Sequence, residues 1–139
     1  MSRHAIHLEK AIDELKHLIL SLGSDVEESV RLSVQSLDQR KPEQAKEVIA
    51  ADYAIDQREV YIEEECLKIL ALPQPVANDL RLIIAILKIN NDLERIADLS
   101  VNIAKRAVYL SGEAKVDLPF DLQKMAEKVQ SMLKRSLDA

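Results

Sequence analysis

The most distinctive candidate for chemistry in this chain is a row of four acidic residues. Steps of four, three and four residues separate them, which places them along one face of an α-helix: Asp52, Asp56, Glu59 and Glu63. Neighbouring like charges at this spacing cost roughly 0.2–0.5 kcal/mol per pair on an isolated helix. Lys46, Arg58 and Lys68 do not stand three or four residues from these acids. Asp52 and Glu59 also fall where apolar residues would continue a buried face. Acids near a packed face need a cation to balance their charge, so we expect one close to this row.

A second carboxylate pair lies in the stretch from Pro73 to Val108. Glu94 and Asp98 are four residues apart, so both carboxylates point the same way. Oxygen ligands on two adjacent helices suit Mg, Ca, Mn or iron, and zinc also accepts carboxylates. The spacing predicts a cation site, with these residues as ligands: Asp52, Asp56, Glu59, Glu94 and Asp98, with Glu63, Asn91 and Glu14 as secondary candidates. The alternative is a solvated acidic surface on which Arg95 shields Asp98.

Other candidate sites have weaker support. Glu14 and His17 form a Glu-x-x-His spacing, as in carboxylate-bridged di-iron bundles, but such bundles need the motif on two helices and the chain has no second copy. A di-metal oxidoreductase therefore stays only as an alternative. Cys66 lies on an apolar line and is predicted to be buried packing. The sequence has no glycine-rich phosphate loop and no nucleophile elbow.

Apolar residues recurring every three or four positions predict the helices that carry these acids. The first runs from about Ala5 to Leu37, and the second from Pro42 to about Leu72. The third follows Pro73 and ends at Gly112, with its apolar line predicted at positions 82, 86, 89, 93, 96, 103, 107 and 110. A fourth amphipathic segment extends from about Leu118 to Leu137. Short connections favour an all-α, up-down-up three-helix bundle with spectrin-repeat-like packing. The fourth helix then packs back, self-associates or belongs to a second unit.

Composition narrows the class of protein. The 139 residues carry a net charge of −5, with 31% charged and 47% hydrophobic residues, which suits one soluble helical domain. An acidic balance argues against nucleic acid as a partner. The N-terminal residues lack the apolar core of a signal peptide, and the apolar run from Leu82 to Leu87 is too short to cross a bilayer. We expect a cytoplasmic protein that is at most peripheral to the membrane.

Several segments resemble the PhoU family of phosphate-transport accessory proteins. They are residues 52–59, residues 62–67, the block Gln74-Pro-Val-Ala-Asn-Asp-Leu-Arg81 and the run Leu93-Glu-Arg-Ile-Ala-Asp98. The resemblance implies an all-helical fold of three-helix repeats with acid-x-x-x-Asp motifs, here Asp52 with Asp56 and Glu94 with Asp98. It implies iron or zinc at these motifs, with Mg, Ca, Mn or Ni as further possibilities. It also implies a non-enzymatic adaptor that contacts the transporter's ATPase subunit and a phosphate-sensing histidine kinase, as a negative regulator of the phosphate-starvation response.

The chain departs from the family pattern in length. Members typically carry two repeats, whereas residues 1–112 form one three-helix bundle and residues 113–139 form a linker and the first helix of an incomplete second repeat. Because that last helix is amphipathic, we expect self-association, as a homodimer. A plain helical interaction module without metal remains the other alternative.

Overall fold

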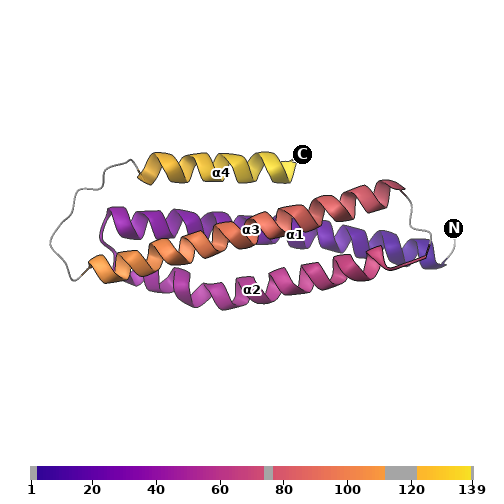
Figure 1. Cartoon of the computed structure of the whole chain (residues 1–139), viewed down its shortest axis with the longest axis horizontal. Helices are drawn as coiled ribbons and strands as arrows, with labels where there is room; N and C mark the ends of the chain where they lie inside the picture. The colour runs from indigo at the N-terminus through magenta and orange to yellow at the C-terminus, as the bar shows by residue number, and fades with distance from the viewer. Residues whose placement is uncertain (1–2, 74–76, 112–121, 139) are drawn as a thin grey trace.

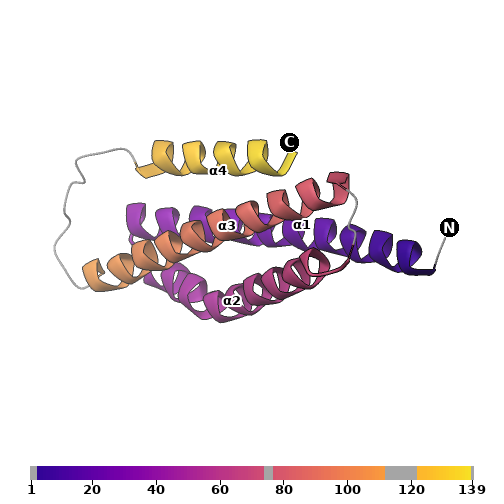
Figure 2. The same cartoon turned by 45° about the vertical axis from the view of Figure 1, so that its right-hand side comes forward.

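The chain forms three long antiparallel helices with a fourth, shorter helix against their side (Figure 1). The computed structural model describes residues 3–73, 77–111 and 122–138. The helices are α1 (Arg3–Asp38), α2 (Pro42–Leu70), α3 (Ala77–Leu110) and α4 (Leu122–Asp138). No strand occurs in these ranges. The all-α bundle predicted from the sequence is confirmed, and the view turned by 45° shows the same arrangement of helices (Figure 2).

A short turn between α1 and α2 makes these two helices antiparallel neighbours. Arg40 adopts the left-handed conformation with φ of 53°, and the Lys41 backbone N–H donates to the Ser36 carbonyl at 2.8 Å, which closes the end of α1. Pro42 begins α2, where its missing N–H costs no hydrogen bond. The Arg40 guanidinium also donates to the Leu110 carbonyl at the end of α3. The turn therefore fixes this end of all three helices.

The core consists of large aliphatic side chains along the middle of the bundle. Leu22, Ile62 and Leu93 are completely buried, one from each long helix. Cys66 is also buried in this core, as predicted, and burial raises the pKa of its thiol to about 11. Small residues replace the aliphatic ones towards the α1–α2 turn, where Ala45 packs with Ala104 and Ala107. Small side chains let the helices approach closely at that end.

The predicted apolar line of α3 is partly wrong. The buried residues of helix α3 are Ile83, Ile86, Asn90, Leu93, Ala97, Ser100, Ala104 and Ala107. Leu82, Ile89 and Ile96, which the sequence pattern placed on the line, are only half-buried and pack at the edge of the core. The error arises because α3 has neighbours on more than one side, so its packed face is wider than one row, and the centre of that face holds small and polar residues.

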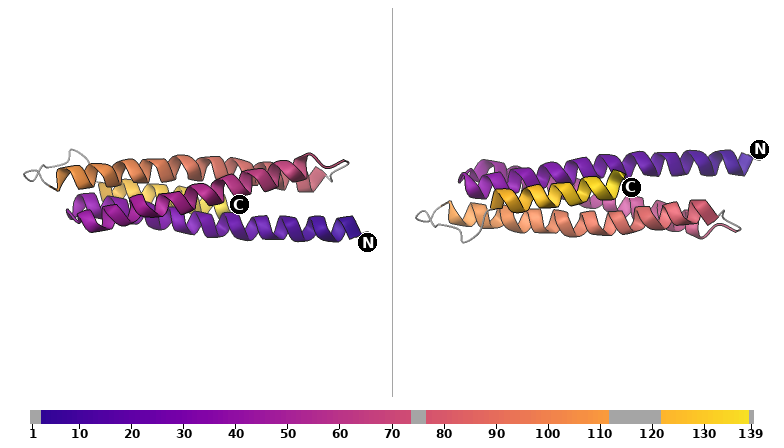
Figure 3. Two further views of the ribbon diagram at one scale, coloured as in Figure 1. Left: turned by 90° about the horizontal axis from the view of Figure 1, so that it is seen from below. Right: turned by 90° about the horizontal axis from the view of Figure 1, so that it is seen from above.

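Helix α4 packs back on the bundle, which is one of the three arrangements left open by the sequence. It contacts α1, and Leu133 is buried in the main core cluster. Viewed from above and from below, α4 and α2 lie on opposite sides of the α1–α3 pair (Figure 3). Gly112, Leu118 and the predicted linker over residues 113–121 lie outside the described residues. The assignment of residues 113–139 as the start of a second repeat stays a prediction.

Within the described ranges, no helix combines the length and the apolar character needed to cross a bilayer.

Candidate metal centre

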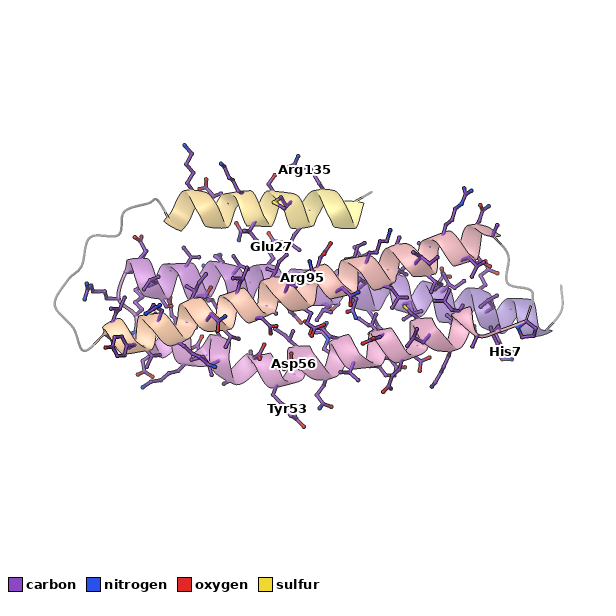
Figure 4. The ribbon with its side chains drawn as sticks, viewed as in Figure 1. His7, Glu27, Tyr53, Asp56, Arg95 and Arg135 are labelled. Carbon is purple, nitrogen blue, oxygen red and sulfur yellow. The ribbon has the colours of Figure 1, made fainter. Side chains whose placement is uncertain are left out.

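Three aspartates from two helices meet near the middle of the bundle. Asp52 and Asp56 lie one turn apart on α2, and Asp98 lies on α3, which packs along α2. One carboxylate oxygen from each of the three lies within 4.8 Å of the other two. Figure 4 labels Asp56 near the middle of α2, at the side facing α3. Three anionic groups at this distance repel one another unless a proton or a cation intervenes.

Asp52 lies at the inner edge of this group. It is half-buried, whereas Asp56 and Asp98 are exposed. Burial raises its pKa, and the charges of Asp56 and Asp98 raise it further. Its Oδ1 atom is buried with no hydrogen-bond partner among the described residues. A buried carboxylate oxygen without a donor is costly, so this atom is available for a cation.

Glu59 is the most deeply buried carboxyl group of the site. Only 4% of the residue is exposed, and its Oε1 atom has no hydrogen-bond partner within the described part of the chain. Burial, as the main cause, and the charges of four acidic neighbours together raise its pKa to about 8: Asp56, Glu94, Asp98 and Asp52. Without a cation, Glu59 is therefore largely protonated at neutral pH.

Asn90 on α3 lies against Glu59. Its Nδ2 atom donates to the Glu59 backbone carbonyl at 2.9 Å, an interaction that ties α3 to α2 inside the core. The Asn90 Oδ1 atom is buried without a partner among the described residues. The sequence pattern missed Asn90, because the predicted line passed through Ile89 and placed polar contacts at Asn91. The sequence did contain a signal for the burial of Asn90, because this polar residue lies between Ile86 and Leu93, each within one turn of it.

The other predicted ligands divide into two groups. Glu94 is exposed and lies outside the three-aspartate group, yet its charge raises the pKa of Glu59, so it lies at the edge of the same acidic region. The secondary candidates Glu63, Asn91 and Glu14 are exposed, and the structure does not bring them into the group. Of the five main predictions, the structure thus gathers three and places Glu59 and Glu94 beside them.

The basic residues of α2 are engaged away from these acids, as their spacing indicated. Arg58 pairs with Asp25 of α1 and donates to Ser21 Oγ at 2.9 Å. Lys46 pairs with Glu43, and Lys68 pairs with Glu65. No ion pair between Arg95 and Asp98 occurs in the part of the chain that the structure describes. The nearby cation is instead Lys105 of α3, whose charge lowers the pKa of Asp52.

The arrangement suits a hard or borderline cation better than acid–base catalysis. Aspartate oxygens are the ligands that Mg, Ca, Mn, iron and zinc accept, and a cation would neutralise the mutual repulsion of the group. The site is open on one side, since two of its aspartates are exposed, and buried on the other at Glu59.

Comparisons with known proteins place the chain among PhoU proteins. A family model described as "PhoU domain" matches residues 19–107. The "Phosphate-specific transport system accessory protein PhoU homolog" of Aquifex aeolicus is 38% identical over 130 residues, which cover 94% of this chain and 59% of that protein. Its namesake in Clostridium acetobutylicum is 37% identical over 132 residues, covering 94% and 60%.

Solved structures give the same result. The crystal structure of PhoU from Pseudomonas aeruginosa matches with a TM-score of 0.87 and 36% identity, over 94% of this chain and 63% of that one. A phosphate transport system regulatory protein PhoU from Streptococcus pneumoniae matches with a TM-score of 0.78 and 33% identity, over 95% and 62%. The chain thus spans about three fifths of the length of these relatives.

Proposed function

Because the chain belongs to the PhoU family, we propose that it is an accessory regulator of phosphate transport. The proposed protein is a cytoplasmic, non-enzymatic adaptor that contacts the ATPase subunit of a phosphate transporter and a phosphate-sensing histidine kinase. Its effect is to repress the phosphate-starvation response. The general role is supported by its relatives, which are named as phosphate-specific transport system accessory proteins.

The second part of the proposal is that Asp52, Asp56 and Asp98 hold a metal ion, with Glu59 and Glu94 beside them. The observation that carries it is the buried, partnerless Oε1 atom of Glu59 next to three aspartates whose oxygens lie within 4.8 Å of one another. Iron or zinc is the proposed ion, with Mg, Ca, Mn and Ni as further candidates. A bound ion supplies positive charge that links α2 to α3.

An oxidoreductase of the carboxylate-bridged class receives no support from the geometry. Glu14 and His17 are both exposed on α1. In carboxylate-bridged bundles the ligands project into the core from several facing helices. The aspartates proposed here instead line one edge, between α2 and α3.

Deletion of the gene in its source organism tests the regulatory role. We expect phosphate-starvation genes to be expressed in high phosphate after deletion, and wild-type protein to restore repression. Unchanged repression in the deletion strain would refute the role.

Complementation with variants then tests the metal site separately. The Asp56→Asn/Asp98→Asn variant removes two charges from the group and should restore repression poorly. The matched control, Glu64→Gln/Asp92→Asn, removes two exposed charges from the same two helices outside the group. Equal activity of the two variants at equal abundance would show that regulation does not need the site.

A further inference from the structure

Charge is distributed unevenly across the bundle. Helix α2 contains eight acidic and three basic residues, although the whole chain has a net charge of only −5. Helix α4 contains four basic residues and two acidic ones. These two helices lie on opposite sides of the α1–α3 pair (Figures 1 and 3). One side of the molecule is therefore acidic, and the opposite side carries a basic helix.

The basic residues of α4 lie along its outer face. Leu133 marks the inner face, since only 3% of it is exposed. Residues at steps of four, three and four lie opposite Leu133 on a helix and are all exposed: Lys124, Lys128, Ser131 and Arg135. Lys134 is exposed beside them. This basic row runs over 12 residues, from Lys124 to Arg135, and its 11 steps extend about 16 Å along the helix. Figure 4 shows Arg135 on α4, across the bundle from Asp56 on α2.

We infer that the basic row of α4 docks the bundle on a membrane surface that contains anionic phospholipid. The inference goes beyond the proposed function and does not depend on it. Three of the four cations are lysines, which interact as point charges without the bidentate geometry that arginine offers to a specific carboxylate. A straight row of such charges suits a planar field of headgroups. Each Lys or Arg near an anionic bilayer contributes about 1 kcal/mol, or about fivefold in binding.

The acidic side of the molecule does not cancel this attraction. Two layers of packing separate α4 from α2, and helix axes lie about 8–10 Å apart per layer, so α2 is roughly 16–20 Å from α4. The Debye length at physiological ionic strength is about 8 Å, so the charges of α2 are largely screened at the α4 surface. Acids also lie on the helices beside the basic row: Glu127 on α4 is exposed, Glu27 on α1 is half-buried, and Asp92 on α3 stands three residues before Arg95.

A second copy of the chain is a less suitable occupant. Contact between the basic α4 of one copy and the acidic α2 of another joins two different surfaces, so the contact does not close and leads to open chains of molecules. A lipid surface binds each molecule separately, so no open chains of molecules form.

Co-sedimentation with lipid vesicles tests the inference. The vesicles contain phosphatidylcholine alone or with about one third phosphatidylglycerol. Wild-type protein should sediment with the anionic vesicles at low salt, and binding should fall as salt rises. Lys128→Gln/Arg135→Gln should weaken binding roughly 25- to 30-fold, from two cations at about fivefold each. Lys46→Gln/Lys68→Gln on α2 changes the net charge equally and should bind like the wild type.

Two outcomes would overturn the inference. The first is that the wild-type protein does not sediment with anionic vesicles at low salt. The same result is expected if α4 instead binds an acidic protein or another copy of the chain. The other is an equal loss for both charge-matched variants, because that result would reflect net charge and not the basic row. Circular dichroism verifies that each variant keeps its helices. Since the replaced side chains are exposed, loss of helix is not expected.

Discussion

Glu59 is a carboxyl group in a bundle core, so at this position the acidic row of α2 is not a solvated surface. The residue is 4% exposed and its pKa is raised to about 8, mainly by burial. An unfolded chain releases this proton near pH 4.5. Between those two values the folded protein binds a proton that the unfolded chain does not. The stability of the metal-free protein must therefore fall as pH rises through this range and level off above about pH 8.

Replacement of Glu59 by Gln tests this at the residue scale. Gln is neutral at all pH values, so Glu59→Gln should have the same stability as the wild type near pH 4.5. Near pH 8.5 the variant should be more stable, by at most several kcal/mol, because each pKa unit corresponds to about 1.4 kcal/mol. Denaturant unfolding in the presence of a chelator measures the difference. The exposed Glu64→Gln controls for loss of one acid from α2. A wild-type profile with no decline across this range would contradict the burial of a protonated Glu59.

A second prediction concerns the replacement of Asp56. The replacement should stabilise the metal-free protein but reduce the stability that the protein gains from metal. The charge of Asp56 raises the pKa values of Asp52 and Glu59. In chelator, Asp56→Asn should therefore raise stability by about 0.5 kcal/mol, because repulsion is removed. With excess Zn²⁺, the wild type should gain stability and the variant should gain much less. Thermal unfolding with and without Zn²⁺ provides both numbers, and equal Zn²⁺ shifts would argue against Asp56 as a ligand.

Much of this residue-scale geometry could be predicted from spacing alone. The row on α2 and the carboxylate pair on α3 were apparent, as was the position of Glu59 on an otherwise apolar line. The hydrogen bond from Asn90 to Glu59 and the effect of Lys105 on Asp52 could not be predicted in this way, since both depend on how α3 rotates against α2. Asn90 lies in the core because the buried face of α3 is shifted by one residue from the predicted line at this point. The spacing of apolar residues does not determine the position of that face to within one residue.

At the scale of the elements, the sequence predicted the helices well because proline and polar segments separate long amphipathic stretches. Pro42 begins α2 as expected. Helix α2 ends at Leu70, two residues before the predicted limit, whereas the predicted start of α4 at Leu118 lies outside the described residues. The placement of α4 could not be predicted, because an amphipathic helix can bury its apolar face in several ways. Contact with α1 decides among them in the structure.

Leu133 tests the docking of α4. Leu133→Ala removes a side chain that is 3% exposed and should cost about 2–3 kcal/mol, near the lower end for buried leucines because α4 lies at the edge of the core. The neighbouring Met132 is 60% exposed, so Met132→Ala should cost less than about 0.5 kcal/mol. Hydrogen exchange along α4, together with denaturant unfolding, measures both. Equal costs for the two variants would show that α4 does not pack through Leu133.

At the scale of the whole molecule, the chain presents different surfaces on its two sides. The α2–α3 edge gathers carboxylates around a buried acid, and α4 on the other side of the bundle carries a basic row. The chain belongs to the PhoU family and shares its helical architecture with the solved PhoU structures. The adaptor role and the partners implied by the resemblance are proposals for this chain, which spans about three fifths of the length of its relatives. The homodimer expected from the amphipathic last helix also stays a prediction.

The central claim is that Asp52, Asp56 and Asp98 hold a metal ion, and isothermal titration of chelator-treated protein with Zn²⁺ tests it most directly. Wild-type protein and the Glu64→Gln/Asp92→Asn control should bind Zn²⁺ with similar affinity and release protons, in part from Glu59. The Asp56→Asn/Asp98→Asn variant should lose most of this binding. Undiminished Zn²⁺ binding by that variant, or none by the wild-type protein, would contradict the claim.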